Sequence, residues 1–198
     1  MFVLGLTGNS GSGKSTVAKI LSGKNAYIID ADILARKVLD VDDRAYGETV
    51  EFFGRDILNC DKTVNRKALS DIVFADGDKL SKLSEITHKH ILEHIYDDVE
   101  RISAEGEWSL IVIDAPLLFE SSLEKACNRV WAVDAPLDQK LQRIMKRDSI
   151  SREKATQRLE RQTPAAELME KAHDVIQNDY DLNGLIAQVD ELFLKLNI

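Results

Sequence analysis

Residues 8–15 read GNSGSGKS and match the pattern G-x-x-x-x-G-K-[ST]. An apolar run over residues 2–7 precedes this stretch, and a run with helical spacing over residues 14–21 follows it. The order predicts a strand, a glycine-rich loop and a helix, whose backbone N–H groups and N-terminus bind phosphate oxygens. We expect Lys14 to act on the β- and γ-phosphates as a catalytic cation, and the Ser15 hydroxyl to bind Mg²⁺. The expected nucleotide-binding residues are Gly8, Asn9, Ser10, Gly11, Ser12, Gly13, Lys14, Ser15 and Thr16.

Further apolar runs predict the rest of an α/β fold. The predicted strands are residues 2–7, 26–30, 110–114, 130–133 and a short 175–176. Most are nearly uniformly apolar, as strands buried on both faces of a parallel sheet are. Helical patterns over residues 14–21, 32–39 and 182–196 alternate with them. This alternation favours a central, parallel, five-stranded sheet flanked by helices.

The remaining segments divide one domain, residues 1–198, into three predicted parts. A helical insertion occupies about 44–106, and an arginine- and glutamate-rich helical flap occupies about 137–172. The core then comprises about 1–43, 107–136 and 173–198.

Composition excludes several classes of protein. The net charge of −8 argues against nucleic-acid binding by bulk electrostatics. No apolar stretch reaches the roughly 20 residues of a membrane span, and the N-terminus is unlike a signal peptide. Cys60 and Cys127 form neither a CxxC pair nor a dense framework, which favours reduced thiols. We therefore expect a cytoplasmic protein without nucleic-acid or membrane partners.

Carboxylates follow two of the predicted strands. Asp114 ends the strand of residues 110–114, which is typical of a carboxylate that supports Mg²⁺ beside a phosphate loop. The stretch IIDADILAR, residues 28–36, places Asp30 and Asp32 on one face if the strand extends that far. By itself this pair is compatible with a metal site, a helix cap or a catalytic base.

Basic residues gather in the flap. Arg143 and Arg147 are four apart and point the same way on a helix, and three more arginines follow at positions 152, 158 and 161. Phosphoryl transfer needs cations around the β- and γ-phosphates, so we expect one or two of these arginines to reach the nucleotide. The alternative is a solvated face whose arginines pair with Asp148, Glu153 and Glu160.

One motif points to different chemistry. Residues 90–94, HILEH, match a zinc-peptidase pattern in which His90 and His94 lie one helical turn apart. His88 lies on the opposite flank, and no third ligand is apparent. A zinc peptidase is therefore a remote alternative.

The absence of two signatures narrows the class of nucleotide-binding protein. No N-K-x-D guanine motif occurs, and LSGK at residues 21–24 lies too early and is incomplete as a transporter ATPase signature. A small core with a helical insertion and an arginine-rich flap suits a small-molecule kinase, whose acceptor hydroxyl needs a carboxylate to take its proton.

The ordered motifs resemble the dephospho-coenzyme A kinase family from about residue 2 to residue 192. The matching stretches are GLTGNSGSGKSTVA (5–18), IDADILAR (29–36), VNRKALSDIVF (64–74), THKHI (87–91), DAPLLFE (114–120), QKLQRIMKRD (139–148), RLERQ (158–162) and AHDVIQND (172–179). The resemblance implies a P-loop kinase fold with a nucleotide-binding core, a helical coenzyme A domain and a lid. It also implies transfer of the γ-phosphate of ATP to the ribose 3′-hydroxyl of dephospho-coenzyme A, the last step of coenzyme A synthesis.

The same resemblance implies roles for individual residues. Asp32 resembles the base on the 3′-hydroxyl, and Arg143 a catalytic, phosphate-binding arginine of the lid, with Arg147 as a further nucleotide contact. The substrate-binding residues implied are Thr7, Asp32, His88 and Leu117.

Departures from the family pattern occur at Asn9, Lys62 and near Tyr180, where the family usually has glycine, and at Lys89, where it usually has proline. Asn tolerates the left-handed backbone conformations that glycine adopts. A related kinase of another small alcohol, nucleoside or nucleotide is the main alternative function. A non-catalytic nucleotide-binding regulator is a third, against which the retention of Lys14, Ser15, Asp32 and Asp114 weighs.

Overall fold

The chain is described by a computed structural model over residues 1–179 and 181–198, so the departure near Tyr180 falls at a position outside these residues. The strands are β1 (Phe2–Thr7), β2 (Ala26–Asp30), β3 (Leu110–Asp114), β4 (Arg129–Asp134) and β5 (Asp174–Gln177). The α-helices are α1 (Lys14–Ser22), α2 (Ala31–Lys37), α3 (Arg44–Phe53), α4 (Arg66–Phe74), α5 (Gly77–Glu105), α6 (Leu137–Asp148), α7 (Arg152–Glu160), α8 (Ala165–Lys171) and α9 (Leu182–Leu194). Two short 3₁₀ helices are η1 (Arg55–Ile57) and η2 (Leu123–Ala126).

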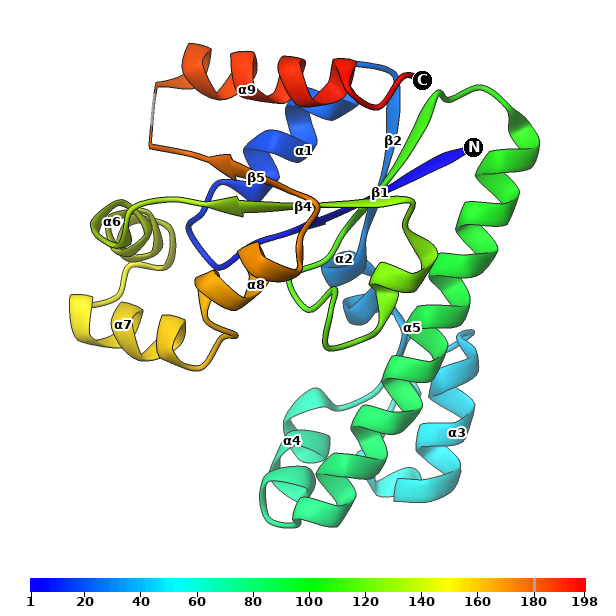
Figure 1. Cartoon of the computed structure of the whole chain (residues 1–198). Coiled ribbons are helices and arrows are strands. Elements are labelled where there is room, and N and C mark those ends of the chain that lie inside the picture. Colours follow the sequence, from blue (N-terminus) through cyan, green and yellow to red (C-terminus); the bar gives the residue numbers. More distant parts are fainter. Residues whose placement is uncertain (180) are drawn as a thin grey trace. The chain divides into compact units, whose positions relative to one another are not determined.

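The five strands form one parallel sheet in the order β2-β3-β1-β4-β5, with β1 at its centre (Figure 1). In this register Leu6 lies opposite Asp114, and Thr7 lies opposite Ala132. The carboxyl ends of β1, β3 and β4 are therefore level, and the segments that follow them meet at one edge of the sheet, where α/β proteins bind ligands. The predicted fold class is confirmed.

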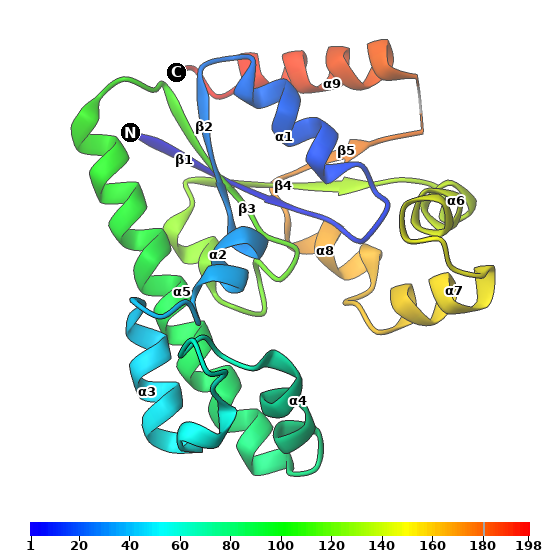
Figure 2. The ribbon, with the colours of Figure 1, turned by 180° about the vertical axis from the view of Figure 1, so that it is seen from behind.

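Apolar side chains bury both faces of the sheet. On one face, Leu4 and Leu6 pack with residues of α1 and α9 in a continuous hydrophobic cluster, and Figure 2 shows these two helices on the same side. On the other face β1 carries Gly5, whose added Cβ would lie 2.8 Å from Leu118 and 2.9 Å from the Cys127 sulfur. The segment between β3 and β4 therefore packs directly on the β1 backbone.

The predicted bounds are correct for three of the five strands. β1, β2 and β3 have the predicted bounds, whereas β4 and β5 extend by one residue at each end. Helix α2 begins at Ala31 and ends at Lys37, where the sequence pattern predicts residues 32–39. Because β2 ends at Asp30, Asp30 and Asp32 do not share a strand face.

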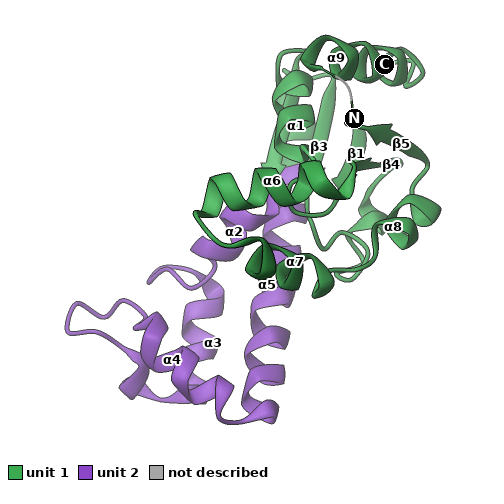
Figure 3. Ribbon diagram, turned by 90° about the vertical axis from the view of Figure 1, so that its left-hand side faces the viewer, with its two compact units in different colours: residues 1–29, 100–198 green, residues 30–99 purple. Residues whose placement is uncertain are grey.

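The chain divides into two compact units, coloured in Figure 3. The first unit comprises residues 1–29 and 100–198 and contains the sheet, α1, α6, α7, α8 and α9. The second comprises residues 30–99 and has its own hydrophobic cluster, formed by α3, α4 and α5 with the segments between them. The boundaries of the predicted insertion and lid stay predictions.

Over the part of the chain that the structure describes, every helix is too short or too polar to cross a membrane.

Candidate active site

The glycine-rich loop joins the end of β1 to the start of α1, as predicted. Ser12 donates its N–H to the Asn9 carbonyl oxygen at 3.0 Å, which closes a turn within the loop. Gly13 is the N-cap of α1 with φ 99° and ψ 15°, a left-handed conformation that glycine adopts without a Cβ clash. The first turn of α1 carries no acidic residue, so its N-terminus favours an anion.

Neighbouring segments hold the loop from outside. An added Cβ on Gly11 would lie 2.6 Å from the Lys140 carbonyl oxygen, and one on Gly13 would overlap the side-chain amide of Asn178. Asn178 donates this amide to the Ser12 carbonyl oxygen at 2.7 Å. Asn178 follows β5 and is a contributor that sequence reasoning missed. Asn178 lies in the stretch AHDVIQND, which resembles the family, and this resemblance is the one sequence signal that could have indicated it. Its contact with Ser12 spans 166 residues of chain.

Lys14 forms an ion pair with Asp114. Asp114 ends β3 and is 6% exposed, so the lysine is held by a buried carboxylate. The β1–β3 register explains this contact, because Asp114 lies beside Leu6, just before the loop begins. Ser15 is exposed in the first turn of α1. The structure thus brings the predicted cation and the predicted strand-end carboxylate together.

The two leading arginines of α6 both contact the loop. Arg143 donates to the carbonyl oxygens of Gly11 at 3.0 Å and Ser12 at 3.2 Å. Arg147 donates to the Ser10 hydroxyl at 3.0 Å and also pairs with Asp148 at 2.8 Å. The guanidinium of Arg147 lowers the pKa of Asp148, and Asp148 in turn raises the pKa of Arg147. Arg143 thus supports the loop backbone, a role that the sequence did not predict.

Two other flap arginines form ion pairs near the surface, and the partner of Arg158 is one that the solvated-face alternative predicts, whereas the partner of Arg152 is not. Arg152 pairs with Asp138 at 2.6 Å, and Arg158 pairs with Asp148. Both arginine side chains are more than half exposed, at 59% and 51%. Such ion pairs between exposed side chains contribute little to stability.

The connection between α7 and α8 also reaches the loop. The Ser10 N–H donates to the Gln162 side-chain oxygen at 3.0 Å, and the Asn9 amide donates to the Thr163 carbonyl oxygen at 2.9 Å. Thr163 also donates its hydroxyl to Glu120, in the segment that follows β3. Asn9, where the family usually has glycine, therefore uses its side chain to join the loop to the flap.

The predicted substrate residues Thr7 and Leu117 lie at the same sheet edge. Thr7 is buried at the end of β1 and donates its hydroxyl to the Pro116 carbonyl oxygen at 3.3 Å. Leu117 is 52% exposed in the turn after β3. Thr7 thus fixes the turn, and Leu117 presents an apolar surface to solvent.

The two aspartates of residues 28–36 have different surroundings. Asp30 is the N-cap of α2 and accepts the Ile33 N–H at 3.0 Å, so of the three roles left open it has the cap. Asp32 lies in the first turn of α2 and is exposed. A base must be accessible to its substrate, and Asp32 meets this condition.

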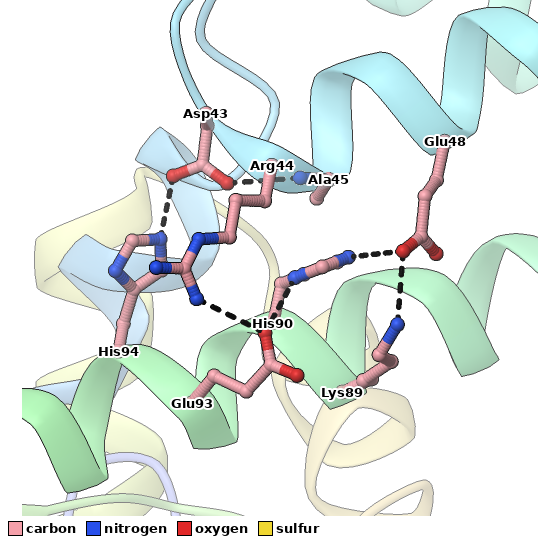
Figure 4. Close-up of polar contacts among 8 residues, drawn as sticks. All are labelled: Asp43, Arg44, Ala45, Glu48, Lys89, His90, Glu93 and His94. Carbon is pink, nitrogen blue, oxygen red and sulfur yellow. Dashed lines mark hydrogen bonds and ion pairs between the residues drawn. The ribbon is translucent and has the colours of Figure 1, made fainter.

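The histidines of α5 lie in a network of polar contacts with carboxylates (Figure 4). His90 is 3% exposed and lies 2.9 Å from Glu93 through Nδ1 and 3.0 Å from Glu48 through Nε2. His94 contacts Asp43 at 2.6 Å, and Asp43 also caps α3 by accepting the Ala45 N–H. These contacts join α3 to α5 in the second unit.

The second unit, as far as the structure describes it, shows no zinc site, and it contains two further residues named from the sequence, His88 and Lys89. Among the described residues, no group of three or more histidine, cysteine or acidic side chains could hold a metal ion, in contrast to the zinc-peptidase alternative. His88 is exposed on α5. Lys89, a departure from the family pattern, pairs with Glu48 at 2.9 Å, which lowers the pKa of Glu48 and raises that of Lys89.

Lys62, a third departure, has a φ of 69°. This left-handed backbone favours glycine, the residue usual in the family at this position. Lys62 keeps the turn through bonds of its backbone, because its N–H donates to the Asn59 carbonyl oxygen and its own carbonyl oxygen accepts from Tyr46.

The chain is similar over most of its length to known dephospho-CoA kinases. The family model for dephospho-CoA kinase matches residues 2–184. A dephospho-CoA kinase of Lactobacillus johnsonii is 37% identical over 195 residues, which cover 98% of each chain. The solved dephospho-CoA kinase of Campylobacter jejuni has a TM-score of 0.72 and 27% identity, over 98% of this chain and 96% of that one.

A solved protein of Thermus thermophilus is also similar, with a TM-score of 0.80 and 29% identity over 98% of this chain and 97% of that chain. The likeness thus extends over nearly the whole length in sequence and in fold. The chain belongs to the dephospho-CoA kinase family.

Proposed function

We propose that the chain transfers the γ-phosphate of ATP to the ribose 3′-hydroxyl of dephospho-CoA, giving coenzyme A and ADP. The match of residues 2–184 to the dephospho-CoA kinase family carries this proposal. The loop between β1 and α1 supports it, because it combines a helix N-terminus without acidic residues and a lysine within reach of phosphates.

In this proposal the phosphates of ATP bind along residues 8–16. Lys14 exchanges part of its contact with Asp114 for the β- and γ-phosphate oxygens, where negative charge redistributes as the γ-phosphoryl group moves. Arg143 and Arg147 keep the loop in shape and add positive charge on the side of α6. The flap contacts of Asn9 and Ser10 exclude water from the same loop.

The acceptor step needs a proton acceptor. We assign it to Asp32, which accepts the proton of the 3′-hydroxyl as the oxygen bonds to the γ-phosphorus and the bond to the β–γ bridging oxygen breaks. ADP leaves with that bridging oxygen. The exposed position of Asp32 in the first turn of α2 and the resemblance of IDADILAR to the family support the assignment.

The donor set near the loop suits Mg²⁺, since the Ser15 hydroxyl and the Asp114 carboxylate supply the oxygen ligands that this ion prefers. Bound there with the nucleotide, the ion would neutralise charge on the β- and γ-phosphate oxygens. Thr7, His88 and Leu117 stay proposed acceptor contacts, and a cytoplasmic location stays a proposal from composition.

The direct test measures ADP release from MgATP in the presence of dephospho-CoA, with nucleoside monophosphates, nucleosides and other small alcohols as alternative acceptors. We expect stimulation by dephospho-CoA alone, and phosphate on the 3′-oxygen of the product. Equal stimulation by another acceptor would favour a related kinase, and no stimulation by any acceptor would favour a non-catalytic nucleotide binder.

A matched pair of variants tests the base. Asp32→Asn should lower kcat by roughly 10²–10⁴ with ATP affinity nearly unchanged. Asp30→Asn makes the same chemical change two residues away, and because asparagine also caps helices well, it should keep kcat. A large loss of ATP affinity in Asp32→Asn would instead indicate a metal-binding or structural role.

A further inference from the structure

Asn178 is a buried polar residue directly beneath the phosphate loop, and neither the motifs nor the reaction chemistry assigned it a role. It is 6% exposed, and its side-chain amide donates to the Ser12 carbonyl oxygen at 2.7 Å. Its backbone N–H donates to the Asp134 carbonyl oxygen at 2.7 Å, where β4 and β5 pair in register. The side chain is thus anchored on the sheet and directed at the loop.

A second donor completes the arrangement. Arg143 donates to the same Ser12 oxygen at 3.2 Å and to the Asn178 carbonyl oxygen at 3.4 Å. The Ser12 carbonyl therefore accepts two hydrogen bonds, from side chains on two different elements. A carbonyl oxygen has two lone pairs, so this group is saturated on the outer side of the loop.

The direction of this carbonyl determines the direction of the next N–H. In a trans peptide the C=O and the following N–H point to opposite sides, so a Ser12 C=O held toward Asn178 turns the Gly13 N–H away from it. Gly13 is the N-cap of α1, where backbone N–H groups bind phosphate. Its Cα also packs against the Asn178 amide, which leaves no space for a Cβ.

We infer that Asn178 is a positioning residue for phosphoryl transfer, which orients the Ser12–Gly13 peptide so that its N–H meets the nucleotide phosphates. The inference rests on the proposed function in that the ligand is a nucleoside triphosphate. Asn178 acts through the backbone and touches no reacting atom, so its loss weakens phosphate binding regardless of the base attached.

The test compares phosphate ligands in the full chain. Calorimetry measures the affinities of wild type and Asn178→Ala for ATP, for ADP and for inorganic tripolyphosphate, which has no base or sugar. We expect each affinity to fall about tenfold, the loss typical of one hydrogen bond, while KM for dephospho-CoA stays unchanged. Asn178→Leu, which keeps the approximate shape but has no donor, should show the same loss if the alanine variant folds poorly.

Asn128→Ala is the matched control. Asn128 accepts the Val3 N–H at 2.7 Å and donates its own N–H to the Val3 carbonyl oxygen, at the other end of β1. Its loss should lower the melting temperature without changing tripolyphosphate affinity. If Asn178→Ala acts only by destabilising the fold, tripolyphosphate affinity should fall in both Asn178→Ala and Asn128→Ala, in proportion to the drop in melting temperature. That result would overturn the inference.

Two further outcomes also overturn it. If ATP affinity falls but tripolyphosphate affinity does not, Asn178 contacts the adenosine instead of orienting the loop. If none of the three affinities changes in Asn178→Ala, the Ser12 carbonyl keeps its orientation without the Asn178 amide. Because the calorimetric titrations contain no dephospho-CoA, they are independent of the acceptor. Wild type that binds phosphates but does not phosphorylate dephospho-CoA would refute the proposed function and leave this inference standing.

Discussion

Gly13→Ala is the substitution whose cost the structure defines best. Gly13 has φ 99°, and an alanine there pays about 1–2 kcal/mol for the left-handed backbone. The added Cβ would also overlap the Asn178 amide, so that amide must leave the Ser12 carbonyl oxygen, which costs about 1–3 kcal/mol for the lost buried bond. Together these terms lower the free energy of unfolding by roughly 2–5 kcal/mol.

Urea unfolding measures this change. Trp108 and Trp131 both lie in the unit that contains Gly13, so tryptophan fluorescence reports its unfolding. Gly47→Ala is the control, because Gly47 lies within α3 and, apart from its chain neighbours and the backbone of its own helix, no atom lies within 4 Å of an added Cβ. That variant, followed by far-UV circular dichroism, should be more stable by about 0.5–1 kcal/mol.

A double-mutant cycle separates the two terms. In an Asn178→Ala background the overlap is gone, and Gly13→Ala should then cost only the backbone term of about 1–2 kcal/mol. If Gly13→Ala in the wild-type background unfolds within about 0.5 kcal/mol of wild type, a range usual for neutral surface changes, the reasoning about both terms is refuted.

Three other predictions concern reactivity and stability. Burial raises the pKa of Cys127 to about 12, whereas Cys60 is exposed. Ellman's reagent at pH 8 should therefore label Cys60 roughly 10²–10³-fold faster than Cys127. Equal labelling rates for the two thiols would contradict this prediction. The hydrogen bond from Arg129 lowers the pKa of Asp174 in the folded protein. The pair therefore stabilises the fold fully above about pH 4, which is the pKa of an aspartate in the unfolded chain. This stabilisation is lost as the pH falls through the lower pKa of the folded state. The difference in unfolding free energy between wild type and Asp174→Asn, about 1 kcal/mol at pH 6, should therefore shrink at pH 2.5; a constant difference would exclude an ionic contribution. Lys62→Gly should raise the free energy of unfolding by about 0.5–1 kcal/mol, because the left-handed backbone at φ 69° is strained for lysine. A lower free energy of unfolding in urea would show that contacts of the lysine side chain outweigh this backbone strain.

The central part of the fold could be predicted from sequence because its signals are local. The bounds of β1 follow from an apolar run that ends at the loop motif, and a carboxylate at the end of a neighbouring parallel strand is expected at the same edge of the sheet. That Asp114 pairs with Lys14 is a finding of the structure. Asp30 as a helix cap was one of three readings, and the end of β2 at that residue decided it.

The supports of the loop could not be predicted in the same way. Asn178 and Thr163 meet the loop over 166 and 154 residues of chain, so no periodicity or spacing relates them to it. The resemblance to the family implies a phosphate contact for Arg143, which stays a prediction. Its donors also reach the carbonyl oxygens of Gly11 and Ser12, contacts that no spacing in the sequence indicates. The sequence pattern thus indicates that Arg143 is a cation near the loop, whereas the tertiary packing determines which atoms its guanidinium contacts.

The strand order has a consequence for biosynthesis. β1 is translated before both of its neighbours, because Phe2 pairs with Leu110 and Leu4 pairs with Arg129. It therefore has no partner strand until β3 and β4 have been made. Residues 30–99, which form their own hydrophobic cluster, are complete before β3 begins. The nucleotide loop is thus translated long before Asn178, which contacts it over 166 residues of chain, emerges to support it. Nascent chains that end before β3 should therefore lack phosphate affinity while residues 30–99 have already acquired helical structure.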